Sequence, residues 1–292
     1  MGPPKPDAYV HAGFTHTEMD GQVNLTRLVA AAAFVFLMGG ASVSGQTEAG
    51  KFLSSIGPQL EAARYSQANE EFAWVGWIGA RVDLYEKGKW TAFFNPNVQT
   101  ILGHRVRSFE AVQANYSLEL GVRRQVGRGQ VTLFFHHVSR HVQDRDKVQA
   151  IDWNFAGVRY ESPWPERWHR GGAFGFSAAV ATLSSGVRYN LEGRISADID
   201  VVRRGNRAAF LLADVRIVGA DPSPNFDRKR VTDFRAELGF RSWNERSQFA
   251  LFVAYEHRGD ALIPQALVTN RGLFGFRIRG EKHATPAIVP LP

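Results

Sequence analysis

The side chains best suited to chemistry lie in one short segment. His136, His137 and His141 are three of the nine histidines, and Ser139 stands between the last two. Because alternate residues of a strand share a face, His137 and Ser139 would bring an imidazole within reach of a hydroxyl. Nucleophilic catalysis by serine needs this pair, together with a carboxylate that orients the ring. The acidic residues available for that third role are Asp144 first, then Asp146 and Asp152.

Other chemistries find little support in the sequence. It has no glycine-rich phosphate loop, no zinc-spaced histidine set and no Gly-x-Ser-x-Gly elbow. Asp144, Asp146 and Asp152 lack the spacing of a calcium loop. The chain has no cysteine, which excludes cysteine hydrolases, iron–sulfur clusters and disulfide scaffolds. We therefore expect no metal and no cofactor.

The composition is that of a folded chain with a net positive charge. Hydrophobic residues make up 44% and charged residues 22%, which excludes a disordered chain. Lys and Arg number 35 against 28 Asp and Glu, a net charge of +7. The basic groups Arg203-Arg204 and Arg228-Lys229-Arg230 fall in predicted turns. Lipid phosphates or a charged rim account for them better than nucleic acid does.

The start of the chain has the pattern of a secretory signal peptide. Arg27 precedes an apolar run of 11 residues, 28–38, and small residues follow as far as Gly45. The run is too short to span a bilayer as a helix. We expect export and cleavage after Gly45, so that 1–45 is leader and signal peptide. A buried core helix is the alternative.

From Phe72 onward the hydrophobic period is two, which indicates strands. In 187–201 the odd positions are mostly apolar, and most even positions are charged or polar. The same alternation occurs in 112–123 and 233–241. Each segment therefore predicts a strand with one apolar and one polar face. The predicted strands are 72–86, 89–103, 109–124, 129–142, 149–162, 172–183, 186–203, 206–219, 230–243, 247–259 and 270–280.

These strands favour a transmembrane barrel over a soluble sandwich or a soluble secreted β-barrel binding protein. Many of them reach 12 to 16 residues, whereas soluble strands usually have about five or six, and short turns connect several of them. We assign the apolar face to lipid and the charged face to the barrel interior. With the signal peptide, this predicts a protein of the bacterial outer membrane, with lipid or lipopolysaccharide and the barrel-assembly machinery as partners.

The fold class predicted is all-β, an antiparallel up-and-down barrel. Bacterial barrels close with an even number of strands, and the turn pattern requires one more strand before residue 72. We therefore expect twelve strands, with ten as second choice. The predicted domains are 1–45 (leader), 46–71 (first strand or short helix), 72–280 (barrel) and 281–292 (C-terminal tail).

The predicted interior face carries a ladder of charges of both signs. In a narrow barrel such charges usually neutralise one another, and twelve strands leave only a small lumen. The ladder comprises Arg188, Glu192, Arg194, Asp198, Arg235, Glu237, Glu256, Arg258 and Arg277.

Two resemblances involve the histidine segment. Its pattern H-x-S-x-H-x-x-D, with 109–116 before it, resembles an uncharacterised family of outer-membrane barrels. The His137-x-Ser139 part is similar to the His-x-Ser of outer-membrane lipid A 3-O-deacylases. That resemblance implies Ser139 as nucleophile and His137 as base, with Asp144 in the third role. Those enzymes usually have Asn after the serine, where this chain has Arg140, and this departure affects the stabilisation of the oxyanion.

Three functions are therefore open. The first is a structural or narrowly channel-forming outer-membrane protein. The second is an esterase (deacylase) of lipid A or phospholipid that uses the lipid-facing Ser139 and His137. The third is a soluble secreted β-barrel that binds a ligand.

Overall fold

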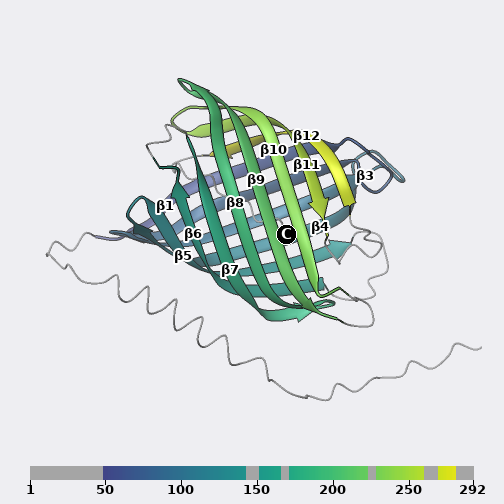
Figure 1. The fold of residues 1–292 in the computed structure, drawn as a ribbon, viewed down its shortest axis with the longest axis horizontal. Helices are drawn as coiled ribbons and strands as arrows, with labels where there is room; N and C mark the ends of the chain where they lie inside the picture. The colour runs from purple at the N-terminus through teal and green to yellow at the C-terminus, as the bar shows by residue number, and fades with distance from the viewer. Residues whose placement is uncertain (1–48, 143–150, 166–170, 223–227, 260–268, 281–292) are drawn as a thin grey trace, which may run out of the picture. The chain divides into compact units, whose positions relative to one another are not determined.

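The computed structural model describes residues 49–142, 151–165, 171–222, 228–259 and 269–280. These residues form twelve antiparallel strands in one closed barrel, in which every strand pairs with its neighbours in the chain and β1 pairs with β12 (Figure 1). The strands are β1 Lys51–Tyr65, β2 Trp74–Lys87, β3 Trp90–Gly103, β4 Glu110–Val126, β5 Gly129–Val142, β6 Ile151–Pro163, β7 Gly172–Ser185, β8 Arg188–Arg204, β9 Arg207–Asp221, β10 Arg230–Trp243, β11 Ser247–Arg258 and β12 Thr269–Gly280.

The predicted fold class is confirmed, with twelve strands rather than ten. The bounds of β2 to β12 lie within two residues of those predicted from the period of two. The additional strand required before residue 72 is β1, so the segment following the predicted leader forms a strand and not a helix. No described residue belongs to a helix that is long and apolar enough to cross a membrane.

The connections distinguish the two ends of the barrel. Four tight turns, at 88–89, 127–128, 205–206 and 244–246, lie at the end where β1 begins and β12 ends. Gly88, Gly127 and Gly205 have φ angles near +57°, a conformation that glycine adopts without steric cost. We call this the short-turn end. The opposite end, which most of the longer connections share, is the long-loop end.

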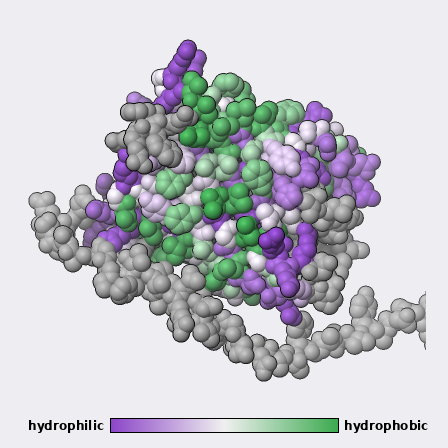
Figure 2. Space-filling model, viewed as in Figure 1, coloured by the Kyte–Doolittle hydropathy of each residue, from purple (hydrophilic) through white to green (hydrophobic). Residues whose placement is uncertain are grey.

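The alternation along each strand separates two environments. On β10, Val231, Asp233 and Arg235 are buried inside, whereas Leu238 and Phe240 are 54% and 73% exposed outside. On the face shown in Figure 2, hydrophobic residues cover the middle of the barrel wall, and hydrophilic residues gather toward the ends. An apolar outer wall around a polar interior is the arrangement of a transmembrane β-barrel.

The predicted alternation is wrong at the start of β8. Val187 and Tyr189 are buried, and Arg188 is exposed instead of lying in the interior ladder. The register between β8 and β9 shifts between Tyr189 and Glu192. Because a bulge of this kind inserts an extra residue, it reverses which side chains point inward. The period of two predicted the strand but placed its first residues on the wrong face.

Candidate functional site

The outward face of β5 carries the histidine segment near the long-loop end. The even-numbered residues from Thr132 to Arg140 are buried inside the barrel. The odd-numbered residues therefore point outward, among them His137, Ser139 and His141. Outward residues of the neighbouring strands flank them, since Ser139 pairs in register with Tyr116 on β4 and Asp152 on β6.

The structure brings Ser139 together with His141. The Ser139 Oγ lies 3.0 Å from the His141 Nε2, a hydrogen-bond distance. The His141 ring also packs edge-on against Tyr116, with ring centroids 5.1 Å apart. If the ring carries its proton on Nδ1, the hydroxyl donates to Nε2, as a nucleophile donates to its general base.

His137 has a different partner from the one predicted. Its Nδ1 donates to the Asn154 Oδ1 at 2.6 Å, whereas Ser139 bonds with the histidine two residues after it. The predicted pairing of Ser139 with His137 is thus replaced by one with His141. The sequence pattern H-x-S-x-H contained both histidines, but only the tertiary structure chooses between them.

Of the three carboxylates expected to orient the histidine ring, the structure describes one. Asp144 and Asp146 lie outside the described residues. Asp152 stands opposite Ser139 in the ladder, and the buried Trp153 beside it shows that Asp152 lies on the outward face. A carboxylate therefore borders the Ser139–His141 pair.

Sequence reasoning missed Tyr116 and Asn154, which contact the two histidines. Tyr116 ends the segment 109–116, to which the sequence assigns no chemical role, and Asn154 belongs to no motif. Both meet the site only through the register of β4, β5 and β6. The polar group lies next to an apolar wall, since Leu118 and Leu183 nearby are 39% and 50% exposed. Polar side chains on a lipid-facing surface are rare and are commonly functional.

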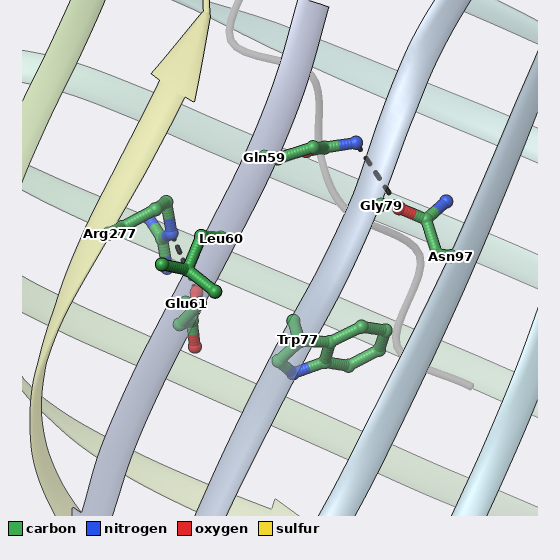
Figure 3. Close-up of a pocket in the computed structure, with 7 residues that line it drawn as sticks. All are labelled: Gln59, Leu60, Glu61, Trp77, Gly79, Asn97 and Arg277. Atoms are coloured by element: carbon green, nitrogen blue, oxygen red, sulfur yellow. Dashed lines mark hydrogen bonds and ion pairs between the residues drawn. The ribbon is translucent and has the colours of Figure 1, made fainter.

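The barrel interior holds a second cluster, made of ion pairs. Glu61 accepts a hydrogen bond of 2.6 Å from Arg277 (Figure 3). It accepts another of 2.6 Å from Arg235, and Glu237 accepts one of 2.6 Å from Arg277. Similar pairs follow around the wall. They join Arg216 to Glu192 and Asp233, Arg194 to Asp214, Arg241 to Asp198 and Asp200, Arg123 to Asp83, Arg159 to Glu119, and Arg258 to Glu256.

Apart from Arg188, the residues of the predicted ladder lie in this interior cluster. The interior is not only charged, however. Trp153, Phe155 and Tyr189 form an apolar cluster with Phe134 and Val138. The prediction that apolar side chains face only lipid is therefore too simple.

Two cavities between interior side chains of the described residues are small. A cavity beside Gln59, Glu61 and Arg277 has a volume of about 10 Å³, roughly the space for one water molecule (Figure 3). In the part of the chain that the structure describes, no three His, Asp or Glu side chains are grouped to hold a metal ion. Within those residues, ion pairs between Arg and Asp or Glu side chains fill much of the interior.

No family model and no curated protein matches the chain. Among solved structures, it is similar to LpxR from Salmonella typhimurium, with 10% identity and a TM-score of 0.46 over 77% of this chain and 99% of that one. It is also similar to the translocator domain of the autotransporter NalP from Neisseria meningitidis, with 10% identity and a TM-score of 0.37 over 89% and 100%. A third is OprB from Pseudomonas putida, with 10% identity and a TM-score of 0.36 over 70% and 59%. These neighbours are outer-membrane β-barrels, and the activity of this chain must be argued from its own residues.

Proposed function

We propose that this protein is an outer-membrane barrel that hydrolyses acyl esters of membrane lipids, either lipid A or phospholipid, at its outward face. Ser139 is the nucleophile and His141 the general base. The observation that carries the proposal is the 3.0 Å approach of the Ser139 Oγ to the His141 Nε2 on that face. Because the longer loops of outer-membrane barrels are extracellular, the pair near the long-loop end stands at the outer leaflet, where the ester bonds of a lipid can reach it.

The reaction follows from the roles of the two side chains. The Ser139 oxygen attacks the ester carbonyl carbon while its proton passes to His141. The tetrahedral intermediate collapses, the lipid alkoxide leaves with that proton, and an acyl-serine remains. Water, deprotonated by His141, then attacks the acyl-serine and releases the fatty acid.

Two neighbours would prepare the pair for this chemistry. The edge of the Tyr116 ring restricts the orientation of His141. Asp152, opposite Ser139 in the ladder, supplies negative charge next to the imidazolium that forms. Arg140 is buried inside the barrel, so the oxyanion must be stabilised by other groups.

The packed interior favours this proposal over a channel. Ion pairs and the aromatic cluster occupy the interior among the described residues, and the cavities beside Glu61 and beside Glu161 each measure about 10 Å³. The apolar outer wall likewise favours a membrane protein over a soluble secreted barrel. A purely structural barrel is the outcome if the esterase test fails.

The test is mass spectrometry of lipid A and phospholipids from cells with and without the protein. Wild type should remove an acyl chain, and Ser139→Ala and His141→Ala should each abolish this loss. Ser242→Ala is the matched control, because Ser242 also faces outward but lies at the short-turn end. Heat-modifiable migration on gels shows that each variant folds.

His137→Ala distinguishes the two histidines. With His141 as base, His137→Ala keeps most of the activity. Identical lipid spectra for wild type and Ser139→Ala would refute the proposal.

A further inference from the structure

The hairpin between β8 and β9 sets two arginines opposite each other at the short-turn end. Arg204 and Arg207 pair in register across the turn, and both are exposed. Ala208, next to Arg207, is 5% exposed and points inward, so Arg207 and its register partner Arg204 point outward. Like charges directly opposite each other destabilise a strand pair. An anion held between the two guanidinium groups would remove this repulsion.

The acidic residues of these strands do not neutralise the arginine pair. Neither Arg204 nor Arg207 forms a side-chain hydrogen bond or ion pair with another described residue. Asp198 and Asp200, which precede Arg204 on β8, are buried inside the barrel, where both form ion pairs with Arg241. The two outward guanidinium groups are therefore available to a ligand that approaches the outer wall.

The wall next to this pair is apolar. Val202, two residues before Arg204, is 56% exposed and pairs in register with Ala209, which pairs in turn with Phe240 on β10. Phe240 is 73% exposed. This apolar row lies about 6.6 Å along the strands from the arginines. A free anion has no use for such neighbours, whereas a phospholipid brings a phosphate and acyl chains together.

The charge of the pair favours an anionic headgroup. A guanidinium group can donate two parallel hydrogen bonds to the oxygens of one phosphate. A zwitterionic headgroup would also bring its own cation next to two guanidinium groups. An anionic headgroup brings a net negative charge, and arginines near a membrane surface attract such lipids.

We propose that Arg204 and Arg207 bind the phosphate of an anionic phospholipid whose acyl chains lie along Val202 and Phe240. The site belongs to the leaflet at the short-turn end, on the opposite side of the membrane from Ser139. It is therefore a second lipid site, and it does not depend on the proposed esterase activity.

The test is native mass spectrometry of the full chain with two lipids that have identical acyl chains, dioleoyl phosphatidylglycerol and dioleoyl phosphatidylethanolamine. Wild type should bind its first phosphatidylglycerol at least about fivefold more tightly than phosphatidylethanolamine. The double variant Arg204→Gln with Arg207→Gln should lower the affinity for phosphatidylglycerol about 5- to 25-fold. Its affinity for phosphatidylethanolamine should not change.

Lys87→Gln with Lys89→Gln is the matched control. It removes the same charge at the same end of the barrel, but Lys87 pairs in register with Trp90 and not with a second cation. This variant should change the affinity for phosphatidylglycerol by less than about twofold. An equal loss in the two double variants would overturn the proposal, because general attraction by positive charge would then explain the binding. Heat-modifiable migration shows that each variant folds.

The source of the phosphate is tested with inorganic phosphate and with Phe240→Ala. Excess inorganic phosphate should not displace the phosphatidylglycerol, and Phe240→Ala should lower the affinities for both lipids alike through the lost acyl contact. Displacement by inorganic phosphate would mean a site for a free anion and would overturn the assignment to a lipid. Equal affinities of the wild type for the two lipids would refute the preference for an anionic headgroup.

Discussion

Glu61 joins three strands through the interior of the barrel, and its replacement by glutamine tests the packed interior. The carboxylate on β1 accepts hydrogen bonds of 2.6 Å from Arg235 on β10 and Arg277 on β12. It is 5% exposed. Glu61→Gln keeps the size of the side chain, but it removes the charge and turns an N–H group toward a guanidinium.

The expected cost follows from this geometry. Both arginines would keep Glu237, Arg235 would also keep Glu256 at 3.7 Å, and both would stay buried. Breaking a buried pair by removing one partner costs about 3–5 kcal/mol, which corresponds to about 10²- to 10⁴-fold in the unfolding equilibrium. The loss is this large only if water does not reach the pair.

The assay is urea unfolding of the purified barrel in lipid vesicles, followed by tryptophan fluorescence. Glu245→Gln, in an exposed turn, is the control for loss of one negative charge. In a double-mutant cycle, Glu61→Gln combined with Arg277→Gln should destabilise the barrel by less than the sum of the single changes.

A loss below about 1 kcal/mol for Glu61→Gln would refute the reasoning, since hydrated ion pairs contribute only that much. Such a result would mean that water fills the interior. It would also restore the narrow channel as an explanation of the charge ladder.

Three further predictions concern packing, conduction and the outward site. Gly239→Ala should destabilise the barrel by about 1–3 kcal/mol, because its Cβ would stand 2.2 Å from the carbonyl oxygen of Leu251. The control Gly193→Ala should leave the stability unchanged in the same unfolding assay, since its Cβ would meet no atom within 4 Å. Wild-type protein in planar bilayers should give no stepwise conductance. Trp153→Ala should also give none, because other buried aromatic residues remain around position 153. Stepwise conductance of the wild type would contradict the packed interior. Tyr116→Ala should lower deacylation about 2- to 10-fold through the loss of its ring contact with His141, and unchanged deacylation rates would remove Tyr116 from the site.

The strands of the barrel follow from local features of the amino-acid sequence. A period of two over long segments specifies which residues alternate, and tight turns with glycine specify where strands reverse. The sequence also predicted a strand before residue 72, because bacterial barrels close with an even number of strands. These features are local, so they can be predicted without knowing what each strand contacts.

The contacts between residues of different strands, in contrast, depend on the fold of the whole chain. The bulge between Tyr189 and Glu192 reverses which side chains point inward at the start of β8. No local sequence pattern predicts this bulge. The choice of His141 over His137 depends on rotamers and on neighbours from β4 and β6. The interior ion pairs likewise join residues as far apart in sequence as Glu61 and Arg277. Such partners are fixed by strand register and by closure of the barrel, and both are properties of the whole chain.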